Sequence, residues 1–237
     1  MSVSGVKAVL FDVFGTVVDW RTSMLDEIGA LVREKNLKIK PEPFIDSWRA
    51  AYRQGMADIR TGNIEKQTNR MVYRIALEKL LLEHTITNVT EDEKDHLSRI
   101  DHRYQPWPDS IPGLNRLKKK FITGTLSNGT SVALVNMAKN VGLPWDVIFS
   151  ADMLGVHKPA PAAYLKAATL LDLEPIQIML AAAHNQDLKG AAAAGLKTGF
   201  IVRSMEFGPG QDKDRTADGP WDIVTNSIEE LAEKLGT

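Results

Sequence analysis

The sequence predicts an α/β fold, with a doubly wound parallel-sheet (Rossmann-like) core and an inserted all-helical cap. Short apolar runs that stop at polar or turn residues alternate with helical patterns over most of the chain. This alternation is typical of a parallel sheet covered by helices. Residues 20–110 instead have helical periodicity throughout. With 237 residues, 43% of them hydrophobic, the chain can bury a full core.

The first predicted strand lies in residues 7–19, where an apolar run stops at Asp12 and the chain turns at Gly15. A short apolar run bounded by a turn signal is typical of a strand buried on both faces. Asp12 then stands at the carboxyl end of this strand, at the edge where open α/β sheets bind ligands. Asp12 is therefore the first candidate site residue. The alternative is an aspartate that only caps a turn.

The helical stretch after this strand predicts a separate domain. Four helical patterns fill it, over residues 22–35, 43–59, 63–83 and 91–103. Three prolines within residues 105–112 indicate the hinge at which the chain returns to the core. We therefore expect a catalytic core of residues 1–19 and 111–237, and a helical cap of residues 20–110. A cap of this kind excludes water and supplies specificity groups.

The remainder of the chain predicts the other layers of the core. The expected strands are residues 121–126, 147–150, 176–183 and 198–202. The expected helices are residues 114–120, 130–141, 160–171 and 187–194. Polar residues follow the strands at Ser127, Asn128, Lys158 and Asp187. Because parallel strands end at one edge of a sheet, we expect these side chains to gather near Asp12.

Composition excludes several classes of function. Lysine and arginine number 29 and aspartate and glutamate 30, so no net field favours nucleic acid or an anionic membrane. The chain has no cysteine, which excludes disulfides, thiolate metal sites and a cysteine nucleophile. No signal-peptide pattern and no apolar run long enough to span a bilayer is present. We expect a cytoplasmic enzyme whose partner is a small molecule.

The run Phe-Asp-x-x-Gly-Thr at residues 11–16 resembles the first motif of the haloacid dehalogenase superfamily, in which the aspartate is a covalent nucleophile. Superfamily phosphatases usually carry a second aspartate two residues later, as a general acid and base, but this chain has Phe14. A phenyl ring cannot transfer a proton, so Phe14 favours attack at carbon over phosphoryl transfer. The alternative for Phe14 is a core-filling side chain.

The chain is similar in particular to the L-2-haloacid dehalogenase (type II) family. The matching residues are Phe14, Ser127-Asn128-Gly129, Tyr164 six residues after Lys158, and Arg49 after Trp48 in the second cap helix. The resemblance implies hydrolysis of short 2-haloalkanoic acids, L-2-haloacids and haloacetates, to 2-hydroxy acids. It also implies an ester on Asp12, no metal and no other cofactor, and a homodimer.

The resemblance implies catalytic roles for the residues of these motifs. Lys158 keeps Asp12 ionised through its charge, and Thr16 positions Asp12 by a hydrogen bond. Asp187 pairs with Lys158 and positions the hydrolytic water. Arg49 stabilises the departing halide together with Asn128.

Substrate binding falls to residues around the same sheet edge. Ser127 and the backbone N–H groups after Asp12 bind the substrate carboxylate. The other residues expected to line the site are Phe14, Gly15, Trp48 and Tyr164. For Arg49 the alternative is a solvated surface arginine, and for Trp48 it is a packing residue.

The fourth motif departs from the familiar pattern. Residues 181–183 are alanines and are followed by His184, where known members carry serines and an asparagine. This change places a titratable imidazole near the ester. Our hypothesis is that His184 orients or deprotonates the hydrolytic water. The alternative is a histidine whose hydrogen bonds are satisfied at a strand end.

Two rival functions remain open on sequence grounds. The first is a magnesium-dependent phosphatase or phosphonate hydrolase, which needs acids of the fourth motif beside Asp12 as metal ligands, where this chain offers only Asp187. The second is a non-catalytic binding protein with the same fold. Retention of Asp12, Ser127, Lys158 and Arg49 together counts against the second rival.

Overall fold

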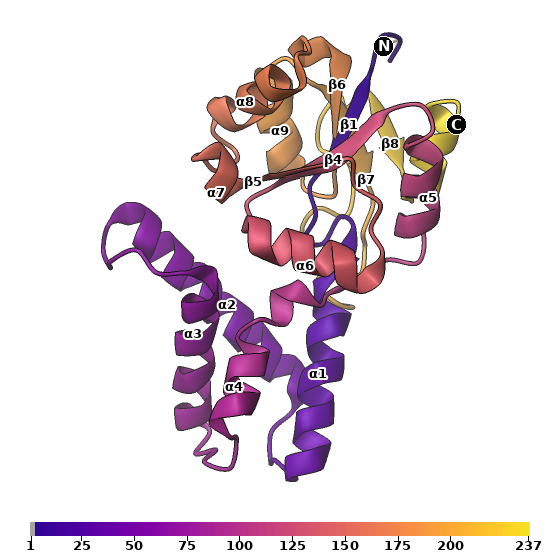
Figure 1. The fold of residues 1–237 in the computed structure, drawn as a ribbon. Helices are drawn as coiled ribbons and strands as arrows, with labels where there is room; N and C mark the ends of the chain where they lie inside the picture. Colours follow the sequence, from indigo (N-terminus) through magenta and orange to yellow (C-terminus); the bar gives the residue numbers. More distant parts are fainter. Residues whose placement is uncertain (1–2) are drawn as a thin grey trace. The chain divides into compact units, whose positions relative to one another are not determined.

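The computed structural model describes residues 3–237 and contains two compact units (Figure 1). One unit comprises the chain up to Trp20 together with Tyr104–Thr237, and the other is Arg21–Arg103. The chain returns to the first unit at Tyr104, ahead of the proline-rich stretch that marked the expected boundary. Tyr104 is fully buried there, with its ring edge-on to Phe14 at 6.0 Å between centroids.

The first unit is built on a six-stranded parallel sheet in the order β5-β4-β1-β6-β7-β8. Its strands are β1 (Ala8–Phe11), β4 (Ile122–Ser127), β5 (Val147–Ser150), β6 (Ile178–Ala182), β7 (Lys197–Ile201) and β8 (Ile223–Thr225). The central strand β1 is buried along its whole length and pairs with β4 on one side and β6 on the other. The predicted doubly wound parallel sheet is confirmed.

Helices cover both faces of this sheet (Figure 1). They are α5 (Ser110–Leu117), α6 (Ser131–Val141), α7 (Ala151–Leu154), α8 (Pro161–Leu171), α9 (Asn185–Ala193) and α10 (Ile228–Lys234). Side chains of α7, α8 and α9 form one hydrophobic cluster with β1, β4 and β6, in which Leu10, Leu180 and Leu188 are fully buried. Helix α5 packs against α10 so closely that a Cβ on Gly113 would lie 2.6 Å from Ile228.

Several short elements of this unit were not predicted. Strand β8 and helix α10 follow the last expected strand, and a two-stranded antiparallel sheet joins β2 (Val18–Asp19) to β3 (Gln105–Pro106). Strands of two or three residues are too short to carry a readable period. Their pairing is decided by the sheet that receives them rather than by their own sequence.

The second unit is all-helical, as predicted. It contains α1 (Trp20–Lys35), whose first residue belongs to the other unit, α2 (Pro41–Thr61), α3 (Asn69–Glu83), α4 (Glu91–Leu97) and the 3₁₀ helix η1 (Ile100–His102). Helix α4 begins with a capping box between Thr90 and Glu93. It ends at Leu97, so the single helix expected over residues 91–103 is in fact two.

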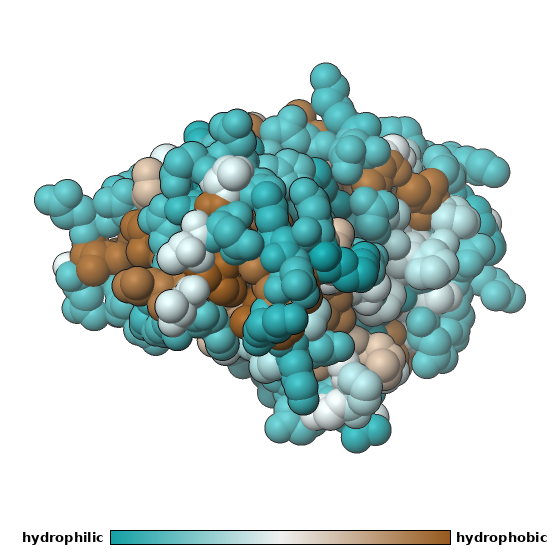
Figure 2. Space-filling view, turned by 90° about the horizontal axis from the view of Figure 1, so that it is seen from below, coloured by the Kyte–Doolittle hydropathy of each residue, from teal (hydrophilic) through white to brown (hydrophobic). Residues whose placement is uncertain are grey.

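The interior of the helical unit forms between α2 and α3. Trp48 and Tyr73 are buried there with their rings edge-on at 5.9 Å, and a Cβ on Gly55 would lie 2.8 Å from Val72. The outer face of α3 exposes Met71 and Leu82. Hydrophobic residues also reach the surface in the view of Figure 2, among a majority of hydrophilic ones.

Within residues 3–237, no helix combines the length and the apolar character needed to cross a membrane.

Candidate active site

The turn after β1 fixes Asp12. The Asp12 backbone N–H donates to the Ala181 carbonyl of β6 at 3.1 Å, so Asp12 stands directly at the strand end. Gly15 turns the chain with a φ of +89°, a left-handed conformation that favours glycine. The turn brings Thr16 back over the aspartate, where its Oγ1 donates to Asp12 Oδ2 at 2.9 Å.

Lys158 lies between two carboxylates. Its Nζ donates to Asp12 Oδ1 at 3.0 Å and also to Asp187 Oδ2. All three side chains are buried. Burial opposes ionisation of Asp12, but the charge of Lys158 and a hydrogen bond from His184 outweigh it and hold the pKa of Asp12 well below its ordinary value. Asp12 is therefore an ionised carboxylate at neutral pH.

Tyr164 binds the second carboxylate, that of Asp187. Asp187 lies in the first turn of α9, and its Oδ1 accepts a hydrogen bond from the Tyr164 hydroxyl at 2.7 Å. Tyr164 is fully buried against Gly190, where a Cβ would lie 2.5 Å from the hydroxyl oxygen. Burial raises the pKa of Asp187, although the charge of Lys158 opposes this shift.

The end of β4 contributes Ser127 and Asn128 at the same sheet edge. Ser127 Oγ accepts a hydrogen bond from the Gly129 N–H at 3.1 Å. The Asn128 side chain binds both backbone groups of Lys158: its Nδ2 donates to the Lys158 carbonyl at 3.0 Å, and the Lys158 N–H donates to its Oδ1 at 2.7 Å. Asn128 therefore fixes the backbone from which the Lys158 side chain extends.

Phe14 connects the first and second motifs by packing. Its half-buried ring lies against Gly129, where a Cβ would stand 2.5 Å from Cε2. The ring also packs edge-on with Tyr104. No carboxylate occupies this position two residues after Asp12.

Trp48 and Arg49 lie on α2 in the helical unit, and their roles at the site stay predictions. Trp48 is fully buried and its Nε1 donates to the Tyr73 carbonyl at 3.0 Å, which is the placement of a packing residue. Arg49 donates to the Tyr73 hydroxyl, and its guanidinium lies 5.3 Å from the centre of the Tyr52 ring. The Tyr52 and Tyr73 rings stack at 3.9 Å.

A buried acid lies in the same polar cluster of the helical unit. Asp101 is 3% exposed, and Asn69 Nδ2 donates to its Oδ2 at 3.5 Å. Burial raises the pKa of Asp101 to about 6, although the charge of Arg49 opposes the shift. Ionisation of Asp101 therefore lowers the stability of the folded protein near neutral pH.

His184 links Asp12 to an acid that the sequence did not single out. His184 Nδ1 lies 3.0 Å from Asp12 Oδ2, and Nε2 lies 2.9 Å from Glu206 Oε2. Burial disfavours the charged ring, but hydrogen bonds and charges of Asp12 and Glu206 outweigh burial and raise the pKa of His184 well above its ordinary value. The imidazole is therefore protonated at neutral pH.

Glu206 is buried and fixed by hydrogen bonds, like the catalytic candidates that it contacts. It is 3% exposed, and the Trp20 Nε1–H donates to its Oε1 at 3.0 Å. Its carboxylate covers Gly15, where a Cβ would lie 2.1 Å from Oε1. No motif or period marked Glu206, which follows the last predicted strand in an irregular segment. The one available signal was an acidic residue shortly after a strand end.

Arg203 stabilises the turn that follows Asp12. Its Nε donates to the Thr16 carbonyl at 2.9 Å, and its two terminal nitrogens donate to Asp109 Oδ1 and Oδ2 at 2.7 and 2.9 Å. Asp109 Oδ2 also accepts from the Ile228 N–H at the start of α10, at 2.7 Å. The Trp107 Nε1–H donates to the Gly15 carbonyl at 2.9 Å. In the sequence, Arg203 directly follows the last expected strand, residues 198–202.

The donor set around Asp12 does not fit a divalent cation. Magnesium requires near-octahedral oxygen ligands and is usually held by carboxylates. Asp12 Oδ1 and Asp187 Oδ2 both accept from the Lys158 ammonium, Asp187 Oδ1 accepts from Tyr164, and Phe14 stands where a further acid would be needed. Across residues 3–237, no group of three or more His, Cys, Asp or Glu side chains is arranged for a metal ion.

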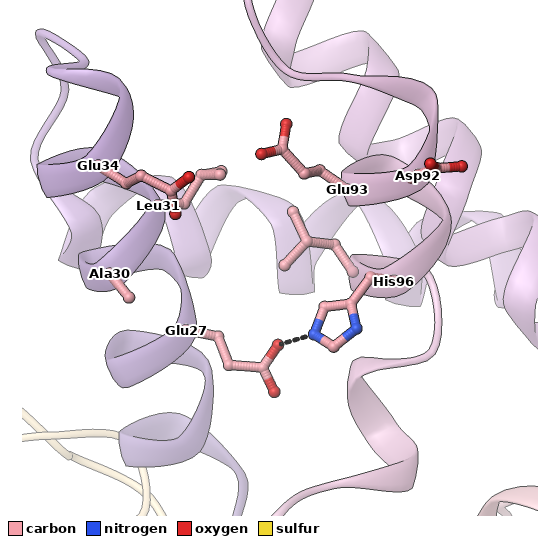
Figure 3. Close-up of a pocket in the computed structure, with 8 residues that line it drawn as sticks. Glu27, Ala30, Leu31, Glu34, Asp92, Glu93 and His96 are labelled. Carbon is pink, nitrogen blue, oxygen red and sulfur yellow. Dashed lines mark ion pairs between the residues drawn. The ribbon is translucent and has the colours of Figure 1, made fainter.

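A cavity in the helical unit is chemically different from this site. It lies between α1 and α4 and is lined by Glu27, Ala30, Leu31, Glu34, Asp92, Glu93, His96 and Leu97 (Figure 3). His96 Nε2 lies 3.5 Å from Glu27 Oε2. Four carboxylates in the lining disfavour an anionic ligand. None of the predicted site residues lies in this cavity.

Comparison with known proteins places the chain in a family. The family model of the haloacid dehalogenase-like hydrolases matches residues 6–195. Among curated proteins, (S)-2-haloacid dehalogenase 4A of Burkholderia cepacia is 26% identical over 97% of this chain and 100% of its own length. A phosphoglycolate phosphatase of Neisseria meningitidis is 23% identical over 99% of this chain and 95% of its own length.

Two solved structures are closer in sequence. The defluorinating L-2-haloacid dehalogenase Rha0230 is 45% identical, with a TM-score of 0.91 over 98% of this chain and 96% of that one. The L-2-haloacid dehalogenase PA0810 is 41% identical, with a TM-score of 0.92 over 98% of this chain and 99% of that one. The chain therefore belongs to the haloacid dehalogenase-like hydrolases and is an enzyme related to hydrolases that act on carbon–halide bonds.

Proposed function

We propose that this enzyme hydrolyses the carbon–halogen bond of short 2-haloalkanoic acids, L-2-haloacids and haloacetates, to give 2-hydroxy acids. The observation that carries the proposal is the buried ion pair of Asp12 and Lys158 at the end of β1, with Phe14 in place of an acid. A carboxylate held ionised can attack carbon, and the position two residues later, where superfamily phosphatases usually carry their general acid, holds a phenyl ring. The dehalogenase relatives support the same activity.

In the first step, Asp12 attacks C2 of the substrate from the side opposite the halogen. A carbon–oxygen bond forms, the carbon–halogen bond breaks, and its electron pair leaves with the halide. The configuration at C2 inverts, and the product is an ester of Asp12. Such covalent catalysis divides one difficult displacement into two easier steps.

In the second step, water attacks Cγ of the ester. The bond from Cγ to the ester oxygen breaks, so this former Asp12 oxygen leaves as the hydroxyl oxygen of the 2-hydroxy acid. The aspartate is regenerated and one proton is released. Asp187 positions the water, and His184 acts on this second step from the Oδ2 side of Asp12.

Substrate binding is proposed for polar groups near the sheet edge. Within residues 3–237, the Ser127 hydroxyl accepts one hydrogen bond and donates none, so its proton is available to a substrate carboxylate. The backbone N–H groups of the turn after Asp12 are further donors. Arg49 supplies a cation for the departing halide, and Asn128 supplies an amide donor. A homodimer and a cytoplasmic location, expected from the sequence, stay predictions.

The rival phosphatase activity is less well supported. The phosphoglycolate phosphatase among the relatives favours it, but the Lys158 ammonium occupies the carboxylate oxygens that would bind magnesium. The second rival, a binding protein without activity, has no observation in its favour here, because the Asp12, Lys158 and Asp187 ion pairs are intact.

The test is halide release in the presence of EDTA. The substrates are L- and D-2-chloropropionate, chloroacetate and fluoroacetate, and Asp12→Asn is the matched inactive control. A parallel reaction contains magnesium and an aryl phosphate. Halide release that survives EDTA and disappears in the control is the expected result. Magnesium-dependent phosphate release without halide would instead establish the phosphatase.

A further inference from the structure

The two oxygens of Asp12 have different surroundings. Oδ1 accepts one hydrogen bond, from Lys158 Nζ, whereas Oδ2 faces two partners, Thr16 Oγ1 at 2.9 Å and His184 Nδ1 at 3.0 Å. Each carboxylate oxygen offers about two lone-pair sites. Among the groups that the structure describes, only Oδ1 keeps an open site, so Oδ1 is the attacking atom. Oδ2 then becomes the carbonyl oxygen of the ester.

Hydrolysis of that ester develops negative charge on Oδ2. Oxyanion donors stand about 2.7–3.1 Å from such an oxygen, and Thr16 and His184 are already at these distances. The Ala183 N–H donates to Thr16 Oγ1 at 2.9 Å, which leaves the Thr16 proton directed at Oδ2. The two side chains therefore have the geometry of an oxyanion hole formed in advance.

Glu206 determines which way His184 can donate. Both ring nitrogens of His184 face a carboxylate oxygen, and a neutral imidazole has a proton on only one of them. The protonated ring has a proton on both, so Nε2–H binds Glu206 and Nδ1–H is still available to Oδ2. Esterification removes the negative charge of Asp12, whereas Glu206 keeps its own. Glu206 therefore holds the donor in place at the stage when Asp12 no longer does.

We propose that Glu206 is a positioning residue that fixes His184 as a hydrogen-bond donor to Oδ2 of Asp12. His184 and Thr16 then form the oxyanion hole for hydrolysis of the Asp12 ester. This inference rests on the proposed function. It gives His184 a donor role on the same step for which the sequence suggested a role toward water.

Hydrolysis of the ester leaves the protonation state of His184 unchanged. The water oxygen bonds to Cγ, and the π pair of the carbonyl moves to Oδ2. The pair returns as the bond between Cγ and Oδ1 breaks, and Oδ1 leaves with the product. One water proton goes to Oδ1 and the other to solvent, while His184 keeps its proton throughout.

The test separates the two chemical steps in four variants. Rapid-quench measurement of halide follows esterification, and intact-protein mass spectrometry follows the ester. The variants are Glu206→Gln, His184→Ala, His184→Asn and, as a control, the exposed Glu233→Gln. Asparagine is the informative replacement because its side-chain N–H lies where Nδ1–H lies in histidine, yet it cannot accept a proton.

The expected results concern the second step. Glu206→Gln gives a halide burst of about one per enzyme, an accumulated ester and turnover slowed by roughly tenfold or more, as when the partner of a catalytic histidine is neutralised. His184→Ala slows hydrolysis by roughly a hundredfold or more, and His184→Asn recovers part of that loss. Glu233→Gln behaves as the wild type. A burst also shows that the variant site is folded.

Two results would overturn the inference alone, given a wild-type enzyme that turns over. One is a His184→Asn enzyme as slow as His184→Ala, since His184 would then act as a proton acceptor. The other is a Glu206→Gln enzyme in which both steps change equally or neither changes. A wild-type enzyme that releases no halide from any haloacid would overturn the proposed function, and this inference with it.

Discussion

The side chain of Asn128 forms two hydrogen bonds to the backbone of Lys158, one to its carbonyl and one from its N–H. Asn128 was expected at the site for the halide, and its contacts in the structure give it a second role. Lys158 lies in the loop between α7 and α8, and these two hydrogen bonds fix the point from which its ammonium reaches Asp12.

Asn128→Ala should therefore slow the first chemical step. Lys158 would be less well placed to keep Asp12 ionised, so we expect a roughly tenfold lower rate of halide release and an acid limb shifted to higher pH. Stopped-flow halide detection across pH measures both. The exposed Asn140→Ala is the control. An unchanged acid limb with weaker substrate binding alone would mean that Asn128 acts on the substrate only.

Lys158→Met should reverse the direction in which the free energy of unfolding changes with pH. In the wild type the pKa of Asp12 is depressed, so Asp12 contributes stability above its unfolded pKa that is lost as the pH falls. Without the ammonium, burial is opposed mainly by His184, so the pKa of Asp12 rises, and the neighbouring buried carboxylates of Asp12 and Asp187 oppose folding as the pH rises. Urea denaturation at about pH 4 and about pH 8 compares the two proteins. The exposed Lys139→Met should follow the wild type.

A single turnover in ¹⁸O-water should place the label in Asp12 and not in the product. The product hydroxyl oxygen comes from the aspartate, because water attacks Cγ of the ester. Mass spectrometry of the peptide that contains Asp12 locates the isotope. Label in the 2-hydroxy acid after the first turnover would indicate direct displacement of halide by water and would contradict the covalent route.

The alkaline limit of ester hydrolysis should report on His184. Asp12 and Glu206 face the ring directly and raise the pKa of His184, whereas the Lys158 ammonium lies beyond Asp12. Removal of the Glu206 charge lowers that pKa, so the Glu206→Gln enzyme should lose hydrolysis at a lower pH than the wild type. The measurement is ester decay against pH in rapid-quench samples. Coincident alkaline limbs would contradict the coupling of His184 to Glu206.

Asp101→Asn should stabilise the helical unit near neutral pH. Since the folded state raises the pKa of Asp101 to about 6, the unfolded chain loses its proton first and stability falls as the pH rises from about 4 to about 6. An amide does not ionise, so we expect a gain of the order of 2 kcal/mol at about pH 7. Denaturation at both ends of this range tests the change, with exposed Asp92→Asn as the control.

The positions of candidate site residues could be predicted from the sequence where these residues follow a strand. Asp12, Ser127 and Asp187 follow buried apolar runs, and the parallel sheet brings those ends to one edge. The same alternation of strands and helices predicts a parallel sheet covered by helices, although it does not give the order of the strands.

Glu206 could not be predicted in this way. It lies in an irregular segment with no period, and its partners His184, Trp20 and Gly15 belong to distant parts of the chain. Arg203 and Asp109 form a similar long-range pair. These contacts exist only once the sheet has assembled, and a single sequence carries no local pattern for them.

The Asp109 carboxylate has a consequence for the C-terminal end of the chain. It binds Arg203, which braces the Thr16 carbonyl, and the same carboxylate receives the first N–H of α10. A chain shortened to end before α10 would keep every catalytic side chain. It would nevertheless lose the hydrogen bond from the Ile228 N–H to Asp109, and the turn that positions Asp12 would be held less firmly. Tags or deletions at this terminus are therefore active-site perturbations, and truncated forms should be assayed for halide release and not only for folding.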